Sequence, residues 1–424
     1  MNKTFKIFTL GCKVNTYESN ALKRLMIDNG YIELHDDTIA DVVILNTCSV
    51  TSVSDQKSRQ HIRKLIKLNP GCCMVVMGCY SQMSANFVST IEGVSIVVGT
   101  NNRHLIPELI EKFLASKKVI NIVESNKRDF DFENDLSIRQ FSETRAFIKI
   151  QDGCNNFCSY CIIPYARGRM RSRSKEKILN EVRELTVNGY KEIVLTGIHT
   201  GGYGLDFENN YHLYDLLKDI ISVEPKVTRL RISSIEQGEI NENIINLLSE
   251  NNIIANHLHI PLQSGCDSTL KRMNRKYDTK MFYDKLCMIR QKRPDIAITT
   301  DVIVGFPGET EEEFNSTYEF IKKCNFSELH VFPYSARQGT LAAKMENQID
   351  PSIKKERVRK LIELSSQLQN KYQASFIGKE VDVLFEEYDQ DTDSFKGHTS
   401  NYIMVHEKSK ENLCNCYKKI IYKG

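Results

Sequence analysis

Short apolar runs alternate with segments of helical periodicity along the first 125 residues. Helices between the runs are indicated by apolar residues at helical spacing, such as Leu22, Leu25 and Met26. The runs are long enough for buried strands and lie at 5–10, 42–45, 74–77 and 96–98. Strand–helix alternation with short links is typical of a parallel sheet covered by helices on both faces. We therefore predict an α/β domain of flavodoxin-like type at residues 1–125.

The same alternation resumes after a polar and acidic linker at 124–144. Six further strands, most of them followed by a helix, are predicted at 147–150, 193–195, 230–232, 257–260, 297–304 and 329–332. Six strand–helix units are too few for a full eightfold barrel. After a charged helix that opens at Pro351, four short strands predict a small β-barrel. The expected domains are 1–125, a core at 140–375 and a tail at 376–424.

Composition and charge narrow the class of protein only slightly. The content of 41% hydrophobic and 26% charged residues is that of an ordinary soluble protein, and a net charge of +3 is too small to indicate a partner. No apolar run approaches the roughly eighteen residues that cross a membrane, and the first residues have too short an apolar core for a signal peptide. Thirteen cysteines in such a chain favour a reducing, cytoplasmic compartment and metal ligation over a disulfide scaffold.

Three cysteines lie within eight positions, in the stretch CNNFCSYC formed by Cys154, Cys158 and Cys161. The arginines that follow would favour thiolates, the form of cysteine that binds metal. A structural zinc site needs four ligands, whereas three thiolates on a four-iron cluster leave one iron open to bind a substrate. This spacing predicts an open iron–sulfur site. The alternatives are a zinc knuckle completed by a distant ligand, a disulfide pair, or chance clustering.

A second trio, Cys12, Cys48 and Cys79, is dispersed in the sequence but follows three successive predicted strands. Because the carboxyl ends of parallel strands share one edge of a sheet, these thiols are expected to converge there. Cys72 and Cys73 open the third strand, at the opposite edge, and should not take part. The alternative is that the three are ordinary buried core cysteines. The pattern favours a second cluster held by three thiolates.

The cysteine motifs carry a family resemblance. CxxxCxxC is the signature of the radical S-adenosylmethionine (SAM) enzymes, and TLGCKVN, NTCSVT and GCYSQ resemble their methylthiotransferase branch. CIIPYARGRMRSR, LTGIHTGGYG, RISSIE and HLHIPLQSG are most similar to the transfer RNA threonylcarbamoyladenosine methylthiotransferases. The isopentenyladenosine and ribosomal-protein branches differ where this chain has Lys13-Val14. A methylthiotransferase for another tRNA adenosine or for a ribosomal-protein side chain remains an alternative, as does a non-catalytic iron–sulfur RNA-binding sensor.

The resemblance implies a partial (β/α)6 barrel and an RNA-binding TRAM module at the tail. It also implies two [4Fe-4S] clusters and SAM as cofactors. The cluster of the CxxxCxxC loop would cleave SAM to a 5′-deoxyadenosyl radical, and the other cluster would deliver sulfur. The substrate would be C2 of an adenosine in a tRNA anticodon stem-loop, and a donor such as flavodoxin or ferredoxin would supply electrons.

The resemblance further implies which side chains meet SAM. Thr196 and Gly197, after the predicted strand 193–195, would meet its amino group. The stretch 301–309 would cradle its adenine, with Gly305 allowing a close backbone approach and Gly308 allowing a turn. The remaining members of the predicted set are Ser234, Glu236 and Gln263. Ordinary turn chemistry or helix capping is the alternative for each of these positions.

Cations alternate with other residues directly after the CxxxCxxC loop, at Arg167, Arg169, Arg171 and Arg173. In an extended segment, side chains at every second position lie on one side. A solvated face is the usual explanation of a charge run. Their position beside the predicted active site raises the alternative that these arginines bind RNA phosphates.

Overall fold

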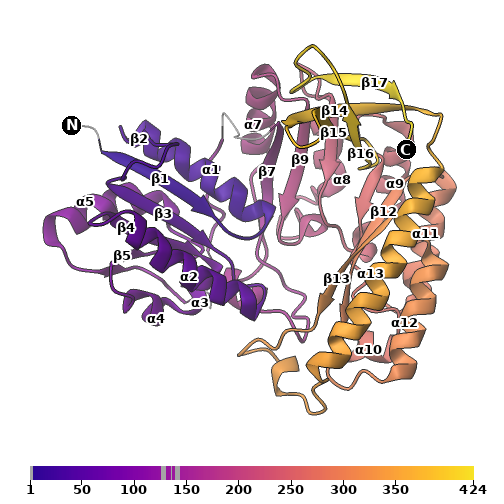
Figure 1. Ribbon diagram of the computed structural model, residues 1–424, viewed down its shortest axis with the longest axis horizontal. Coiled ribbons are helices and arrows are strands. Elements are labelled where there is room, and N and C mark those ends of the chain that lie inside the picture. Colours follow the sequence, from indigo (N-terminus) through magenta and orange to yellow (C-terminus); the bar gives the residue numbers. More distant parts are fainter. Residues whose placement is uncertain (1–2, 126–129, 135, 139–143) are drawn as a thin grey trace. The chain divides into compact units, whose positions relative to one another are not determined.

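The computed structural model of the protein describes residues 3–125, 130–134, 136–138 and 144–424 (Figure 1). Contacts within the chain group it into two compact units. Unit 1 is formed by Met1–Ser142, Lys149–Asn156 and Cys161–Glu181, and unit 2 by Glu143–Ile148, Phe157–Tyr160 and Val182–Gly424. This grouping differs from the three predicted domains, whose boundaries remain predictions. Among the described residues, no helix is both long and apolar enough to cross a membrane.

Unit 1 is built on a six-stranded parallel sheet with the order β2-β1-β3-β4-β5-β6. Its strands are β1 (Thr4–Thr9), β2 (Ile32–Glu33), β3 (Val42–Thr47), β4 (Cys73–Gly78), β5 (Val94–Val97) and β6 (Ile120–Asn121). Every residue of β3 and β4 is buried, as expected for central strands covered on both faces. The four strands predicted from apolar runs are confirmed as strands, although in β1 only Phe5 is buried. The edge strands β2 and β6 have two residues each and leave no periodic pattern.

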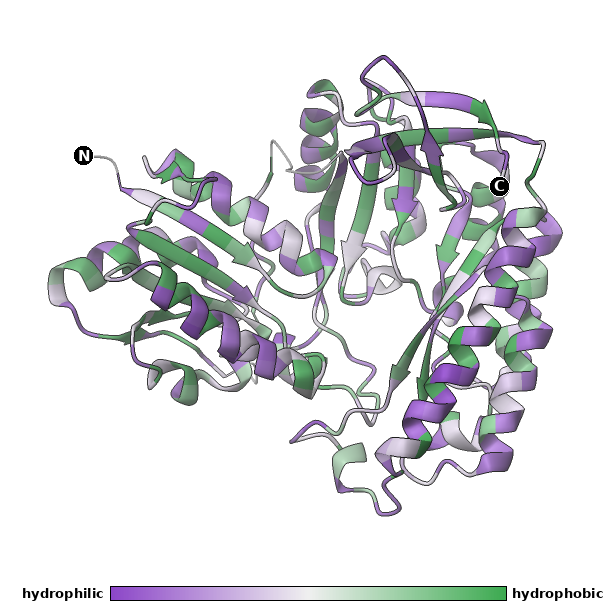
Figure 2. Cartoon of the chain, in the orientation of Figure 1, coloured by the Kyte–Doolittle hydropathy of each residue, from purple (hydrophilic) through white to green (hydrophobic). Residues whose placement is uncertain are grey.

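Helices cover both faces of this sheet (Figure 1), and alternate residues of a strand enter different cores. In β3, Val42 and Ile44 pack with α1 and α5, whereas Val43 and Leu45 pack with α2. Figure 2 shows these strands as apolar between helices whose outer faces are polar. The helices are α1 (Lys13–Asp28), α2 (Ser52–Leu68), α3 (Cys79–Met83), α4 (Ala85–Ser89), η1 (Arg103–Leu105), α5 (Ile106–Ser116), α6 (Ile163–Arg167) and α7 (Lys175–Val187), which ends in unit 2.

Six parallel strands form the partial barrel that the resemblance implies. They belong to two sheets, β10-β9-β7-β8 and β11-β12-β13, which a parallel bridge between Ser234 and His259 joins. The first strand, β7, begins in unit 2 and ends in unit 1, where it pairs with the short antiparallel strand β8 (Arg171–Ser172). The six strands are β7 (Arg145–Asp152), β9 (Glu192–Gly197), β10 (Arg229–Ile232), β11 (His257–His259), β12 (Ala297–Val304) and β13 (Glu328–Pro333).

The helices of unit 2 have clear local start signals. At α12, the Thr310 hydroxyl accepts a hydrogen bond from the Glu313 amide at 3.2 Å, and three glutamates occupy the first turn, where the helix dipole favours negative charge. Figure 1 shows α11, α12 and α13 packed side by side. The helices are η2 (Thr200–Gly202), α8 (Leu213–Ile221), η3 (Gln237–Glu239), α9 (Glu242–Glu250), α10 (Asp267–Arg272), α11 (Thr279–Lys292), α12 (Glu311–Cys324), η4 (Ala342–Lys344) and α13 (Pro351–Ala374).

The tail forms a small antiparallel sheet of order β16-β15-β14-β17, with its own apolar core. Its strands are β14 (Glu380–Asp389), β15 (Ser394–Thr399), β16 (Met404–Glu407) and β17 (Tyr417–Ile421). Two buried arginines of β10 dock this sheet: Arg229 donates to the carbonyl of His398 and Arg231 to that of Ser400, both at 3.1 Å. The tail is therefore part of the packing of unit 2.

Candidate active site and cluster ligands

Each cysteine of the dispersed trio follows the carboxyl end of a different strand of the unit 1 sheet. Cys12 is the N-cap of α1 after β1, Cys48 follows β3, and Cys79 opens α3 directly after β4; these three strands are neighbours. A Cβ added to Gly11, whose φ is +109°, would lie 2.8 Å from the Cβ of Cys48 and 3.1 Å from its sulfur. The turn before Cys12 therefore touches Cys48, and only glycine fits between them.

Two thiols of this trio, Cys48 and Cys79, are buried, and burial raises the pKa of both. The pKa of Cys79 is raised to about 12, mainly by burial; Arg167 opposes this shift, and the negative charges of Cys12 and Cys48 add to it. Metal binding at Cys79 must therefore displace a proton, as is general for thiolate ligands. Cys73, at the opposite end of β4, packs in the apolar core between the sheet and α1 and α5. The expectation that Cys73 is structural agrees with this placement.

A fully buried arginine binds the sulfur of Cys79. The Nε–H of Arg167 donates to the Cys79 Sγ at 3.3 Å, and its two terminal nitrogens bind Glu18 and Asp152 at 2.8 and 3.1 Å and the Asn15 amide oxygen at 2.8 Å. The two carboxylates thus hold the planar guanidinium of Arg167 in place, with its Nε–H directed at the Cys79 sulfur. Since Asp152 directly precedes Gly153 and Cys154, the same arginine ties the edge of the sheet to the start of the CxxxCxxC loop.

Buried charges around Glu18 and Asp152 are more cationic than anionic. Lys149 bridges the two carboxylates at 2.7 and 2.5 Å, and two further arginines, Arg103 and Arg171, each pair with one of them. Burial by itself raises the pKa of Glu18, but Arg103, Arg167 and Lys149 together hold it below the usual range. Both carboxylates stay ionised, and the excess positive charge favours a thiolate nearby.

The CxxxCxxC loop, residues 154–161, connects β7 to α6. In unit 1, the Cys154 amide donates to the Gly168 carbonyl at 3.2 Å, and a Cβ on Gly153 would collide with the Arg169 carbonyl oxygen at 1.9 Å. In unit 2, the Ser159 hydroxyl and amide donate to the carbonyls of Arg272 and Met273 at 2.8 and 3.0 Å. The backbone of the loop is therefore fixed, while its three cysteines are partly exposed.

Arg275, which was not predicted from the sequence, performs at Cys158 what Arg167 performs at Cys79. Its Nη1 donates to the Cys158 Sγ at 3.3 Å, and its Nε to the Tyr277 hydroxyl at 3.1 Å, while its other terminal nitrogen pairs with Glu236. The carboxylate of Glu236, predicted to meet SAM, is thus tied through Arg275 to a cysteine of the loop. The stretch MNRKYD contains no metal or catalytic motif, so only the fold reveals this role.

The residues predicted to meet SAM follow the carboxyl ends of four strands of unit 2. Thr196 and Gly197 end β9, Ser234 and Glu236 follow β10, Gln263 follows β11, and Gly305 and Gly308 follow β12. The Gly305 amide donates to the Glu309 carboxylate at 2.6 Å, and Arg357 of α13 binds the same carboxylate at 2.6 Å. A Cβ on Gly305 would lie 2.4 Å from the Lys354 side chain. Their individual roles toward SAM remain proposals.

Three of the four arginines predicted to meet RNA phosphates are buried in ion pairs, so that prediction is wrong for them. Arg167 and Arg171 bind Asp152, and Arg173 pairs with Glu181. The segment is not one extended row either, because it comprises the end of α6, the strand β8 and the approach to α7. Only Arg169 of the four is exposed. Sequence reasoning missed the partners because they are distant: Glu18 lies 149 positions from Arg167.

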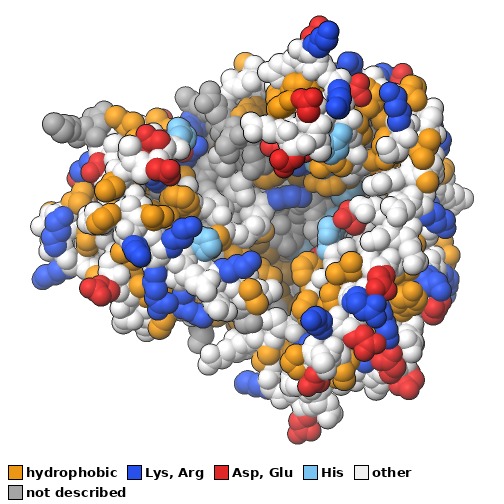
Figure 3. All heavy atoms as spheres, in the orientation of Figure 1, with side chains coloured by type: hydrophobic (Ala, Val, Ile, Leu, Met, Phe, Trp, Pro, Cys, Tyr) orange, Lys and Arg blue, Asp and Glu red, His pale blue; other side chains and the backbone are white. Residues whose placement is uncertain are grey.

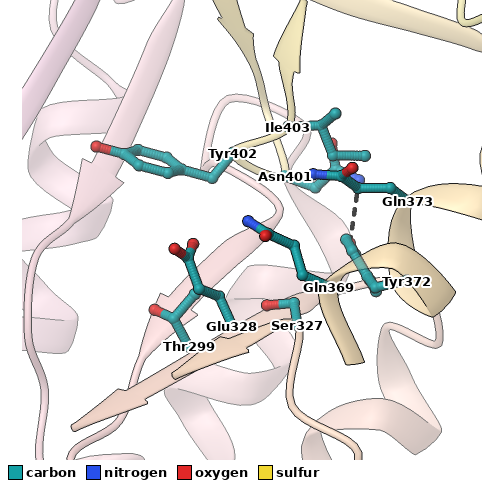
Figure 4. A pocket seen from close by; sticks show the side chains of 9 residues that line it. All are labelled: Thr299, Ser327, Glu328, Gln369, Tyr372, Gln373, Asn401, Tyr402 and Ile403. Atoms are coloured by element: carbon teal, nitrogen blue, oxygen red, sulfur yellow. Dashed lines mark hydrogen bonds between the residues drawn. The ribbon is translucent and has the colours of Figure 1, made fainter. Parts of the chain in front are cut away.

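A small pocket in unit 2 is not the active site (Figure 4). It lies between β12, β13, the last turns of α13 and residues 401–403, and Tyr372 and Asn401 are hydrogen bonded across it at 3.0 Å. Its volume of about 20 Å³ is room for a single water molecule.

Comparison with known proteins indicates the class of protein to which this chain belongs. Residues 148–321 match the Radical SAM superfamily, and residues 4–99 match the uncharacterized protein family UPF0004. The chain is 46% identical over 421 residues to the threonylcarbamoyladenosine tRNA methylthiotransferase MtaB of Bacillus subtilis, covering 98% of this chain and 93% of that protein. It is 38% identical to MtaB of Aquifex aeolicus, over 89% and 91% of the two chains.

More distant proteins agree with this comparison. The chain is 34% identical to the tRNA-2-methylthio-N(6)-dimethylallyladenosine synthase of Acetivibrio thermocellus, over 97% and 86% of the two chains. The solved structure of the radical SAM methyltransferase TsrM from Kitasatospora setae covers 78% of this chain and 75% of its own, with a TM-score of 0.57 and 15% identity, which shows the fold alone.

The partial parallel barrel with its CxxxCxxC loop defines a radical SAM enzyme. Within that class, the chain belongs to the methylthiotransferase family, whose members resemble it over nearly its full length.

Proposed function

We propose that this protein is a tRNA methylthiotransferase that places a methylthio group on C2 of N6-threonylcarbamoyladenosine at position 37 of the anticodon loop. The observation that supports the proposal most is the pair of cysteine trios, each following strands of a parallel array. The near-full-length relatives at 46% and 38% identity support the same substrate.

The reaction needs a cofactor because the C2–H of adenine is not acidic, so a histidine or carboxylate acting as a base could not activate it. When bound, two [4Fe-4S] clusters and SAM supply the one-electron chemistry, the sulfur and the methyl group. Cys154, Cys158 and Cys161 would hold the cluster that meets SAM. Cys12, Cys48 and Cys79 would hold the second cluster. Each trio would leave one iron of a four-iron cluster without a protein ligand.

The other residues of the site bind and orient. The main chain at Thr196, Gly197 and Gly305 would approach SAM closely, and the Glu309–Arg357 pair holds the Gly305 turn. Ser234, Gln263 and Gly308 line the same edge of unit 2. The fixed loop backbone around Ser159 presents Cys158 in one orientation. The proposed partners are the tRNA anticodon stem-loop and a cytoplasmic electron donor such as flavodoxin or ferredoxin.

The proposed domains assign these parts to the chain. Residues 1–125 would bind the second cluster, residues 140–375 would form the radical SAM core with its following helix, and residues 376–424 would be a TRAM-like RNA-binding module. In a single-stranded anticodon loop, an adenine can leave the stack without melting a duplex, so a base at position 37 is accessible to such a site.

Anaerobic reconstitution of single-cysteine variants tests the two-cluster assignment. Cys158→Ala should abolish 5′-deoxyadenosine formation, whereas Cys79→Ala should retain some SAM cleavage but insert no sulfur. Cys73→Ala is the matched control, because this cysteine is buried at the start of β4, the strand that Cys79 directly follows. Full methylthiolation by Cys79→Ala would contradict the assignment. Absence of 5′-deoxyadenosine from the reconstituted wild type would favour a non-catalytic sensor.

A second candidate substrate is a dimethylallyl-type adenosine, because relatives at 34–36% identity carry that name. Mass spectrometry of bulk tRNA from cells that lack the gene separates the two. Loss of the methylthio mark on threonylcarbamoyladenosine alone supports the proposal. Loss on dimethylallyladenosine alone would replace it, and no loss from any tRNA nucleoside would point to a protein substrate.

A further inference from the structure

Helix α2 carries a larger positive charge than the composition of the whole chain would suggest. Its seventeen residues, Ser52–Leu68, carry five cations and one carboxylate, a net charge of +4, whereas all 424 residues sum to +3. The cations are Lys57, Arg59, Arg63, Lys64 and Lys67. By contrast, α5 of the same unit carries one lysine and two glutamates.

These cations share one face of the helix. The opposite side of α2 is fixed by Ser58, Ile62 and Leu65, which are buried at helical spacing against the sheet. At 100° per residue, all five cations fall on the half turned away from that stripe. Figure 3 shows Lys and Arg side chains gathered over the face where Figure 1 places α2.

Four of the cations are available to a ligand. Lys57, Arg63, Lys64 and Lys67 are exposed, and among the residues that the structure describes none of the four has a carboxylate partner. The fifth, Arg59, lies 5.8 Å from the centre of the Tyr80 ring and is partly buried. The single carboxylate, Asp55, accepts a hydrogen bond from Ser49 at 2.8 Å in the first turn. This surface is therefore an unneutralised basic stripe.

The stripe starts beside a proposed cluster ligand. The Ser58 hydroxyl, on the buried face of α2, donates to the carbonyl of Cys48 at 3.2 Å, and Thr51 caps the helix three positions after Cys48. The helix then extends about 25 Å away from that point, at about 1.5 Å per residue. A polyanion bound along α2 would thus reach the edge of the sheet where Cys12, Cys48 and Cys79 lie.

We infer that the exposed face of α2 binds the phosphate backbone of the anticodon stem of the substrate tRNA. The inference rests on the proposed function, since it requires an RNA substrate. Phosphates on successive nucleotides offer a row of negative charge that matches a row of cations along a helix, and such contacts position the nucleic acid without reading its sequence. Because Arg167, Arg171 and Arg173 are buried, they do not meet RNA phosphates, and the exposed face of α2 would make such contacts instead.

The test measures binding of a synthetic anticodon stem-loop RNA to the reconstituted full-length protein over a series of salt concentrations. The variant replaces three lysines of the stripe, Lys57→Gln, Lys64→Gln and Lys67→Gln. The matched control replaces three exposed lysines of outer helices of unit 2, Lys218→Gln, Lys292→Gln and Lys355→Gln, and so changes the net charge equally. A charge-keeping variant changes the three stripe lysines to arginine.

The stripe variant should bind RNA about tenfold or more weakly, and its plot of log affinity against log salt should be shallower by about 0.7–0.9 for each lysine that meets a phosphate. The control and the arginine variant should keep the wild-type slope. Iron content and thermal unfolding verify that each variant is folded. An unchanged slope in the stripe variant, or an equal loss in the control, would overturn the inference alone. If wild-type protein bound no RNA, the proposed function would fall with it.

Discussion

At the scale of single residues, each cysteine trio is accompanied by a buried arginine that donates a hydrogen bond to one sulfur. Arg167 donates to Cys79 and Arg275 to Cys158, both at 3.3 Å, and each arginine is oriented by a carboxylate. Hydrogen bonds to cluster sulfurs stabilise the more negative, reduced cluster and so raise its reduction potential. The two arginines are therefore expected to tune the two proposed clusters independently.

Replacement of each arginine by lysine tests whether Arg167 and Arg275 act on different clusters. Arg167→Lys keeps the positive charge but loses the planar guanidinium, so the midpoint potential of the cluster proposed at Cys12, Cys48 and Cys79 should fall while that of the other cluster stays. Arg275→Lys should do the reverse, and each variant is the control for the other. Redox titration followed by electron paramagnetic resonance measures both midpoints. Equal shifts of both clusters in either variant would contradict this expectation.

Gly11 offers a second test at one residue. In Gly11→Ala, the new Cβ would lie 2.8 Å from the Cys48 Cβ, so the trio should spread and the iron content should fall by about half, to that of one cluster. Gly30→Ala is the control, because Gly30 also has a positive φ, of +83°, but nothing within 4 Å of the added Cβ. Iron and sulfide analysis of the two variants tests this expectation. Equal iron content in both would show that the contact between residue 11 and Cys48 does not affect cluster binding.

At the scale of elements, Glu192 of β9 joins the barrel to the tail. It pairs with both Arg229 and Arg231 of β10, and these arginines donate to backbone carbonyls of the tail sheet at His398 and Ser400. The Tyr402 ring lies 4.5 Å from the Arg231 guanidinium. Burial opposes ionisation of Glu192, but Arg231 and Arg229 outweigh it and lower its pKa from 4.5 to about 2.

A lowered pKa in the folded state stabilises the protein above the unfolded pKa, and this stabilisation is lost as the pH falls. For Glu192 the loss should occur between about pH 4.5 and pH 2, and amounts to roughly 3 kcal/mol. Glu192→Gln should remove this part of the acid dependence and destabilise unit 2 at neutral pH by about 3–5 kcal/mol, because two buried arginines lose their charge partner. Urea unfolding at pH 7 and pH 3 compares the two proteins. If the free energy of unfolding changed equally between pH 7 and pH 3 in the wild type and in Glu192→Gln, the role assigned to Glu192 would be wrong.

At the scale of the whole molecule, the tail is integrated into unit 2. Besides the β10 arginines, Arg145 of β7 pairs with Glu386 at 3.3 Å and donates to the Tyr402 hydroxyl at 2.9 Å. A protein that ends at residue 375 would therefore leave three arginines of the barrel without their tail partners. Its melting temperature should fall by on the order of 10 °C, in addition to any loss of RNA binding. An unchanged melting temperature would show that the tail is an independent module.

Much of the fold could be predicted because its signals are local. The strands β1, β3, β4 and β5 are short and mainly apolar, and the helices between them show their period within a few turns. Cys12, Cys48 and Cys79 each follow one of those strands. In a parallel sheet the carboxyl ends of the strands lie at one edge, so the topology places the three residues at that edge.

The sequence by itself thus determined where the strands lie and which cysteines follow neighbouring strands of the unit 1 sheet, and it led to the proposal of open metal centres. Only the tertiary structure decided that Arg167, Arg171 and Arg173 are buried, that Arg275 meets Cys158, and that the free basic surface is α2. The physical reason is that a strand depends on neighbours in sequence, whereas the burial of a cation depends on carboxylates that folding brings from far along the chain.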